Sequence, residues 1–491
     1  MTEILSKEQE YALAKFKKGE NLFITGPGGA GKSRLIYHMT QHAKQANKTF
    51  QVCALTGCAA VLLKNGGKTI HSWSGIKLAR GPKQKILGDI LYNNRKAKKK
   101  WCKVDILIVD EVSMMSEKIF DILDTIGKIF RSSNLPFGGI QMVFSGDFFQ
   151  LPPVGTYGEP DTAMFCFESS KWVKTFPLNN HIELETIFRQ TDPVYIKILS
   201  QIRRGYLEPE YIDILNNNIN RSFDSTKYGG ITPTKLFPIK MKVDHVNRTM
   251  FETIDDIEYE LECSIKTNCL TNLETGKLLS SELQIKCDKM TETEKNYEIE
   301  NMLNNTPCER ELKLKVGANV LCTVNIDMEN GICNGSQGKI IDIKEIGDKL
   351  TVIVRFTNGI TRTIEPYFWQ SDEFPCIAVG QYPLMLAWAL TIHKIQGATL
   401  SLAEIDIGKS VFEYGQSYVA LSRVKSLDGL YLSAFDPGCI RANPKVIEFY
   451  NNMPKIDYSN IELTEPNPFK EFELKEESYE LQNKDVKIIK L

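Results

Sequence analysis

Gly26-Pro27-Gly28-Gly29-Ala30-Gly31-Lys32-Ser33 matches the complete G-x-x-x-x-G-K-[ST] template of a phosphate-binding loop. It lies between an apolar run of strand type, residues 21–25, and a segment with helical spacing, residues 34–46. Glycines let the backbone approach an anion closely, so amide N–H groups and the positive end of the following helix can face phosphate oxygens. The strand, loop and helix together predict an α/β fold that binds a nucleoside triphosphate.

Two side chains of this loop have predicted chemical roles. Lys32 would reach the β and γ phosphates of the nucleotide. The Ser33 hydroxyl would bind Mg²⁺, an ion that prefers oxygen ligands and keeps several waters while it bridges phosphate oxygens.

A buried-strand run over residues 104–111 ends in two carboxylates, Asp110 and Glu111. In the phosphate-loop fold an acid at the end of a core strand holds Mg²⁺ with the loop Ser or Thr, so Asp110 and Ser33 are the predicted metal ligands. Glu111 would polarise the attacking water as general base.

A third strand-like run, residues 139–146, leads into a polar segment that contains Gln150 and the pair Pro152-Pro153. Ligands gather at the carboxyl ends of strands in an open parallel sheet, so Gln150 is placed to sense the γ-phosphate. The two prolines predict a stiff exit from this loop.

Composition limits the class of protein. The chain has 491 residues, enough for about three domains, and its 42% hydrophobic and 25% charged residues are those of a globular protein. A net charge of −1 means that any nucleic-acid contact must come from local basic patches. Twelve cysteines without a C-x-x-C pair argue against a zinc ribbon and a disulfide scaffold. With no bilayer-length apolar run and no signal or transit peptide at the start, we expect an intracellular, reducing compartment.

Taken in order, the segments resemble the Pif1 family of superfamily 1B DNA helicases, in the RecD/Pif1 group. The resemblance runs from about residue 5 to residue 435, and residues 137–154 are its most family-specific part. The matching segments are a Q motif at 5–9, motif Ia at 56–60 and 69–73, motif II at 110–114, motif IV at 188–190, barrel segments at 312–318 and 324–338, motif V at 387–397 and motif VI at 418–423.

The resemblance implies two RecA-like domains with ATP and Mg²⁺ in the cleft between them, and a small SH3-like β-barrel inserted in the second domain. It implies a catalytic set of Lys32, Asp110, Glu111, Gln150, Arg189 and Arg423, in which the two arginines reach the γ-phosphate across the cleft. The implied ATP contacts are Gln9, Gly26, Pro27, Gly28, Gly29, Ala30, Gly31, Lys32 and Ser33. The implied contacts to single-stranded DNA are Thr56, His71, Trp73, His393 and Lys394.

The function implied is an ATP-dependent 5′→3′ DNA helicase that acts on single-stranded DNA and forks in replication, repair, recombination or telomere maintenance. A translocase of the same fold on RNA stays an alternative. A catalytically silent relative is disfavoured because all six catalytic candidates are present, and a small-molecule kinase has no reason to carry residues 148–154 or 391–397. We expect a monomeric motor without membrane attachment, in the nucleus or at a viral or host replication site.

Changes of pattern along the chain predict the domain limits. Residues 1–180 form a first motor domain with a small insertion near 75–100, and residues 181–254 and 376–450 form a second. Residues 255–375 form the inserted domain, in which short alternating runs and Asn-Gly turns predict an antiparallel barrel. Residues 451–491 form a tail that we expect to be partly disordered and to offer a docking segment for replication or repair proteins.

Two segments carry expectations of their own. Residues 290–306 have little apolar periodicity and predict a flexible loop. Residues 95–100, Arg-Lys-Ala-Lys-Lys-Lys, are the densest basic run and fit three interpretations: a solvated loop, a phosphate contact from an accessory element, or a nuclear localisation signal.

Overall fold

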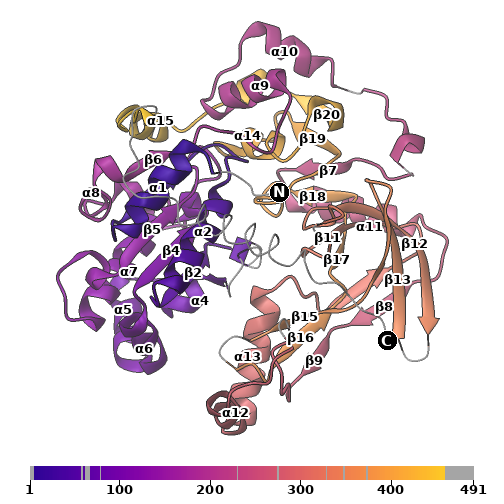
Figure 1. The fold of residues 1–491 in the computed structure, drawn as a ribbon. Helices are drawn as coiled ribbons and strands as arrows, with labels where there is room; N and C mark the ends of the chain where they lie inside the picture. The colour runs from indigo at the N-terminus through magenta and orange to yellow at the C-terminus, as the bar shows by residue number, and fades with distance from the viewer. Residues whose placement is uncertain are drawn as a thin grey trace, which may run out of the picture.

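The computed structural model of the chain describes residues 5–458, except for 57–58, 61–62, 64–66, 78, 220, 229, 274–275, 328, 347–348 and 372–373. Figure 1 shows an α/β unit from the N-terminal part of the chain, a second α/β unit above it and a β-rich unit beside them. The predicted tail lies outside the described residues beyond position 458. No helix in the described part of the chain has the length and apolar character needed to cross a bilayer.

The first unit is built on a six-stranded sheet with the order β3-β2-β4-β5-β1-β6, and all its strand pairs are parallel. Its strands β1 and β4 are buried along their whole length, as expected for a parallel sheet covered on both faces. The strands are β1 (Leu22–Thr25), β2 (Phe50–Ala54), β3 (Lys68–Thr69), β4 (Ile106–Asp110), β5 (Gln141–Ser145) and β6 (His181–Glu183). The predicted α/β class is confirmed.

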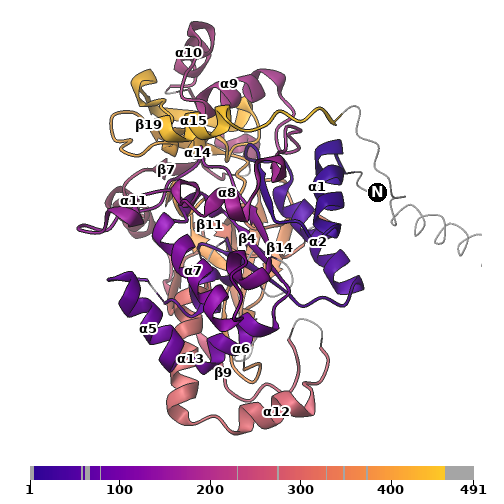
Figure 2. The same cartoon turned by 90° about the vertical axis from the view of Figure 1, so that its left-hand side faces the viewer.

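Helices cover both faces of this sheet. Figure 2 shows α1 and α2 on one side of β4 and α7 on the other, and the two sides bury separate apolar clusters. The helices are α1 (Lys7–Lys17), α2 (Lys32–Gln45), α4 (Ile70–Ser74), α5 (Lys83–Asn93), α6 (Arg95–Lys103), α7 (Glu117–Phe130) and α8 (Trp172–Thr175). The phosphate-binding loop therefore connects the buried strand β1 to α2.

The basic run 95–100 is part of the helix α6, which corrects the loop interpretation. The Asn94 side chain caps its start by accepting a hydrogen bond from the backbone N–H of Ala97 (2.9 Å). Trp101 is fully buried and fixes the helix to the domain core. The burial of this one aromatic side chain stabilises the helix despite the repulsion among its lysines. The charge pattern alone did not indicate a helix here.

The second unit is a four-stranded parallel sheet with the order β18-β7-β19-β20. Its strands are β7 (Thr234–Phe237), β18 (Ala389–Thr391), β19 (Ala403–Ile407) and β20 (Leu430–Phe435). Its helices are α9 (Pro193–Arg203), α10 (Pro209–Asn216), α11 (Lys240–Glu252), α14 (Gln416–Leu421) and α15 (Pro444–Asn451). Helix α15 leaves this unit and packs on the first, because Val446 and Phe449 join the aromatic cluster around Phe148.

The inserted unit is antiparallel, as predicted. A five-stranded sheet has the order β14-β13-β12-β11-β17, and smaller sheets join β15-β16-β9 and β10-β8. The strands are β8 (Tyr259–Glu262), β9 (Ser264–Lys266), β10 (Glu311–Leu314), β11 (Asn319–Cys322), β12 (Gln337–Ile346), β13 (Lys349–Phe356), β14 (Thr361–Ile364), β15 (Tyr367–Gln370), β16 (Ala378–Gln381) and β17 (Leu384–Leu386). The helices α12 (Ser281–Asp288) and α13 (Glu292–Asn305) complete it.

Strand pairing places two domain limits at other residues than the sequence pattern predicted. Strand β6 pairs with β1, so the first unit extends through residue 183 rather than ending at 180. Strands β16 and β17 belong to sheets of the inserted unit, so that unit ends near residue 386 rather than at 375. Strand pairing decides both limits, and it joins segments that are far apart in sequence.

The predicted flexible loop at 290–306 is wrong, because helix α13 occupies most of it. Thr291 and Glu294 form a capping box in which each side chain bonds the backbone N–H of the other residue. Ile299, Met302 and Leu303 are buried against the inserted unit. Only three apolar side chains in this polar segment are spaced as on one face of a helix. Such a short pattern does not predict a helix unless the surface that buries them is known.

The cap at Thr291 provides a test of this helix. We expect Thr291→Ala to remove about 1 kcal/mol of cap stability and to speed amide exchange in the first turn of α13 about fivefold. Hydrogen exchange followed by mass spectrometry measures this effect. The control is Thr293→Ala, an exposed residue of the same turn without a capping role. Equal exchange in both variants would contradict the capping box.

Candidate nucleotide and nucleic-acid sites

The phosphate-binding loop curls around its own lysine. The Lys32 ammonium donates hydrogen bonds to the carbonyl oxygens of Gly26 (2.6 Å) and Pro27 (3.1 Å). Gly29 and Gly31 have φ angles of +91° and +80°, the left-handed region that favours glycine. Burial lowers the pKa of the Lys32 ammonium, and the carboxylates around it, led by Asp147, oppose that effect. The loop therefore holds a half-buried cation where the template expects phosphate.

Helix α1 supports the loop through Gln9, which is fully buried. Its side-chain amide donates to the carbonyl oxygens of Ala30 (3.4 Å) and Gly31 (3.3 Å). Its amide oxygen accepts from the backbone N–H of Ser6 (3.0 Å), which completes the helix cap. In this structure Gln9 thus fixes the loop backbone, and its contact with adenine stays a prediction.

The two carboxylates lie where β4 ends. Burial, and then the neighbouring Glu111 carboxylate, raise the pKa of Asp110 to about 6. Glu111 has a φ of +55°, a strained value for a residue with a side chain. Ser33 follows Lys32 in the first turn of α2. Among the described residues, no group of three or more His, Cys, Asp or Glu side chains is arranged to hold a metal ion.

Both predicted arginines lie beside the loop, Arg423 from the second unit and Arg189 from the segment between β6 and α9. A Cβ atom built on Gly28 would lie 3.4 Å from Nη2 of Arg423 and 3.6 Å from Nη1 of Arg189. Burial, and then the charge of Arg423, lower the pKa of Arg189 to about 9. Two guanidinium groups and Lys32 therefore surround one loop, an arrangement that an anion would stabilise.

The end of helix α14, in motif VI, holds these arginines in place. Arg423 donates from Nε to the carbonyl oxygen of Val419 (2.9 Å) and from Nη2 to Oγ of Ser422 (2.8 Å). Arg189 donates to the carbonyl oxygen of Ser422 (3.0 Å). The hydroxyl of Tyr418 accepts from the backbone N–H of Gly28 (2.9 Å), so the two units are in direct hydrogen-bond contact.

Gln396 joins the site although the sequence suggested no role for it. Its amide donates to Oε2 of Glu111 (3.1 Å) and to Oε1 of Gln150 (3.4 Å). It comes from the segment 391–397, which also carries the predicted DNA contacts His393 and Lys394. Its position inside motif V was the only sequence feature that could have suggested a role for it. The side chains that it contacts are known only from the tertiary structure.

A buried ion pair also joins the two units. Arg203 on α9 donates to the Asp147 carboxylate from Nε (3.0 Å) and Nη2 (3.0 Å), and to Oε1 of Glu183 (2.9 Å). Its guanidinium lies 4.8 Å from the centre of the Phe149 ring and 5.2 Å from that of Tyr450. Asp147 follows the end of β5, three residues before Gln150, so this pair anchors the sensor loop.

The predicted strand contacts divide into two groups. Trp73 is only 3% exposed and its ring centre lies 4.9 Å from that of Trp101, so it is a core residue in place of a base-stacking one. Lys394 is exposed, and His71 and His393 are half-buried. Burial lowers the pKa of both imidazoles, which leaves Lys394 as the cation of this group.

Thr56 is half-buried, and its hydroxyl accepts from the backbone N–H of Ala59 (3.2 Å).

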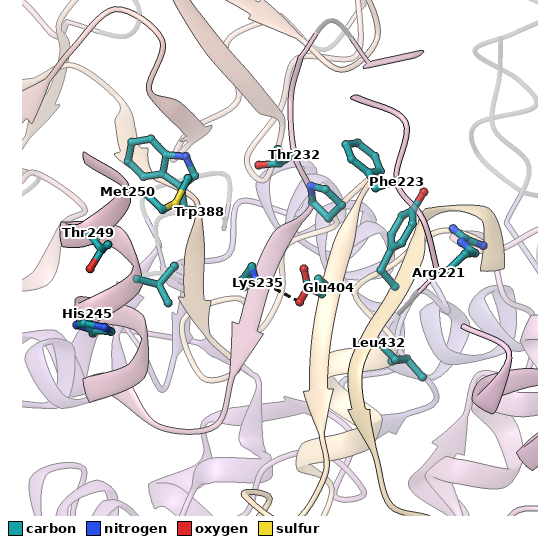
Figure 3. Close-up of a pocket in the computed structure, with 13 residues that line it drawn as sticks. Arg221, Phe223, Thr232, Lys235, His245, Thr249, Met250, Trp388, Glu404 and Leu432 are labelled. Atoms are coloured by element: carbon teal, nitrogen blue, oxygen red, sulfur yellow. Dashed lines mark ion pairs between the residues drawn. The ribbon is translucent and has the colours of Figure 1, made fainter. Parts of the chain in front are cut away.

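A cavity of about 620 Å³ lies away from the predicted strand contacts, on the sheet of the second unit (Figure 3). Trp388 and Phe223 stand at its two ends, and an ion pair between Lys235 and Glu404 (3.4 Å) crosses its floor. None of the predicted nucleotide or strand contacts lines it.

Comparison with known proteins identifies the family. The family described as PIF1-like helicase matches residues 4–209, and the DNA helicase Pif1 2B domain matches residues 298–343. The crystal structure of Pif1 helicase from Candida albicans is 33% identical, covers 92% of this chain and 100% of its own, and has a TM-score of 0.69. The chain belongs to the Pif1-like helicase family.

Two further relatives add detail. The ATP-dependent DNA helicase PIF1 of Xenopus laevis is 33% identical over 453 residues, which are 92% of this Pif1-like chain and 65% of the frog protein. A Bacteroides Pif1 helicase in complex with ADP-AlF3 and single-stranded DNA is 28% identical and covers 91% of this chain and 97% of its own, with a TM-score of 0.59. The chain spans 63–65% of the length of the first curated relatives.

The ion pair between the units gives a stability prediction. We expect Arg203→Met to cost about 3–5 kcal/mol, because it leaves the Asp147 carboxylate buried and unpaired. Thermal unfolding measures the loss, and Arg204→Met, at the exposed residue directly after the end of α9, is the control. Adding Asp147→Asn to Arg203→Met should restore part of the stability. Equal melting temperatures for the Arg203 and Arg204 variants would contradict this anchor.

Proposed function

We propose that this chain is an ATP-dependent DNA helicase that moves 5′→3′ on single-stranded DNA. The observation that carries the proposal is the position of two arginines beside the phosphate-binding loop of the first unit: Arg423 from the second unit and Arg189 from the segment that joins the units. The name of the Xenopus relative and the nucleotide analogue and single strand in the Bacteroides complex support it.

In this proposal the six catalytic candidates act on one triphosphate. Lys32, Arg189 and Arg423 neutralise the charge that spreads over the γ-phosphate oxygens in the transition state. Glu111 accepts a proton from the attacking water, and Gln150 orients towards the γ-phosphate. Gly26 to Ser33 and Gln9 hold the rest of the nucleotide.

We propose Mg²⁺ as the accompanying ion. The Ser33 hydroxyl and the Asp110 carboxylate are hard oxygen ligands, the kind that Mg²⁺ prefers. The raised pKa of Asp110 fits this role, because a nearby cation would favour its ionised form. When bound, the ion would supply charge that neutralises the phosphates, and phosphate oxygens would complete its ligands.

Hydrolysis would change how the two units are held together. With the γ-phosphate present, both arginines and Lys32 have a shared anion. After its release, three positive groups face one another, so the closed arrangement loses stability and the cleft opens. Gln396 bonds Glu111 and Gln150 and lies two residues after Lys394, which would carry this change to the bound strand.

We propose that the strand lies along Thr56, His71, His393 and Lys394, where Lys394 contacts phosphate and the imidazoles pack against sugars or bases. Because all six catalytic candidates come from one chain, we propose a monomeric motor. Its pathway would be replication, repair, recombination or telomere maintenance at forks, in the nucleus or at a viral or host replication site.

Two substitutions separate binding from hydrolysis. We expect Lys32→Ala to abolish ATP turnover, because the loop loses its only lysine. Arg423→Ala should keep ATP binding but lower kcat on the order of 10³-fold, because it removes charge needed in the transition state. Arg441→Ala, an exposed arginine of the same unit, is the control. Undiminished turnover in either test variant refutes that residue's assignment.

Polarity is tested with partial duplexes that carry a single-stranded tail at either end. We expect ATP-dependent strand separation with a 5′ tail and none with a 3′ tail. Separation from 3′ tails alone would overturn the direction. Absence of any DNA-stimulated ATPase activity would overturn the motor itself, and stimulation by RNA in place of DNA would favour the RNA translocase.

A further inference from the structure

Helix α6 presents a concentrated positive surface that the nucleotide site does not use. Six of its nine residues are lysine or arginine, and its first turn holds no acid. Arg95, Lys98, Lys99 and Lys103 are exposed. Within the described residues these four form no ion pair. We call the exposed side chains of these four residues the α6 basic face.

This arrangement is electrostatically unfavourable for the isolated chain. Cations at the start of a helix oppose its dipole, and like charges three or four residues apart repel. Arg95 is subject to both effects, because it lies at the start of the helix and Lys98 and Lys99 follow it by three and four residues. The whole chain has a net charge of −1, so the face is a local feature rather than part of a basic protein. A polyanion would supply the missing counter-charge.

The helix is held rigidly beside the predicted strand contacts. The indole N–H of Trp101 donates to the carbonyl oxygen of Ser74 in α4 (3.2 Å), and its ring packs against Trp73. Arg131 donates to the carbonyl oxygens of Trp101 (3.0 Å) and Val104 (3.0 Å). Helices α4 and α6 are therefore packed against each other, and α4 also carries His71.

The chemistry of the face favours a duplex over a single strand. Binding of single strands combines cations with aromatic rings that stack on bases, but the aromatic residue of α6 points into the core. The face spans about 12 Å, at 1.5 Å of rise per residue, which is enough to follow neighbouring phosphates of one backbone. Contacts of this kind grip a duplex without reading its sequence.

Resting on the proposed helicase function, we propose that the α6 basic face binds the phosphate backbone of the duplex next to the single strand held by the motor. Lys96 is not part of this face, since its ammonium lies 4.8 Å from the ring centre of Phe374 in the inserted unit. The four side chains of the α6 basic face are exposed and can contact the duplex. Figure 2 places α6 towards the end of the molecule opposite α14 and α15.

The test compares two DNA probes over a series of salt concentrations. The probes are a 5′-tailed duplex and the same tail as a single strand, and fluorescence anisotropy gives each dissociation constant. For Lys98→Gln with Lys99→Gln, we expect the slope of log Kd against log salt to become about 1.8 less steep on the tailed duplex, as two lost phosphate contacts require. Binding to the tail alone should not change.

The control is Lys18→Gln with Lys174→Gln, two exposed lysines of the first unit outside α6, one directly after α1 and one on α8. This variant should leave both slopes unchanged. Gln and Lys have similar helix propensity, so the test variant keeps α6. An unchanged slope on the tailed duplex would overturn the site, and an equal loss on both probes would assign the face to the single strand instead. A wild-type protein that binds neither probe would overturn the proposed function as well.

Discussion

Positively charged side chains from separate parts of the chain lie around one glycine-rich loop. The rest of the structure holds these side chains beside that loop. Lys32 belongs to the loop, whereas Arg189 and Arg423 arrive from beyond residue 183 and lie beside Gly28. Buried like charges repel, and this repulsion contributes to the lowered pKa of Arg189. In the proposed function a triphosphate would relieve this repulsion and so couple nucleotide binding to domain closure.

A second set of contacts joins the two units away from the loop. Arg203 binds Asp147 with two hydrogen bonds, and the hydroxyl of Tyr450 bonds the Thr25 side chain at the end of β1 (2.5 Å). Because α15 returns to the first unit after the second is complete, the chain crosses between the units twice. The ion pair at Asp147 therefore joins the two units three residues before Gln150.

Much of the first unit could be predicted because its signals are local. The loop template, the buried strand before it and the carboxylates at 110–111 all follow from short stretches of sequence. The parallel sheet and the family are confirmed, while the roles of the site residues stay predictions. The errors came where tertiary packing outweighs local pattern: α13 looked like a loop, and Trp73 looked available to DNA until Trp101 was found against it.

The sequence by itself determined the phosphate loop, the order of the motifs and the antiparallel character of the insertion, because turn, strand and glycine preferences act over a few residues. Only the tertiary structure decided that Gln396 contacts Glu111 and Gln150, that β16 and β17 belong to the inserted unit, and that α6 presents its cations together. Each of these depends on contacts between distant segments, whose energies no local pattern records.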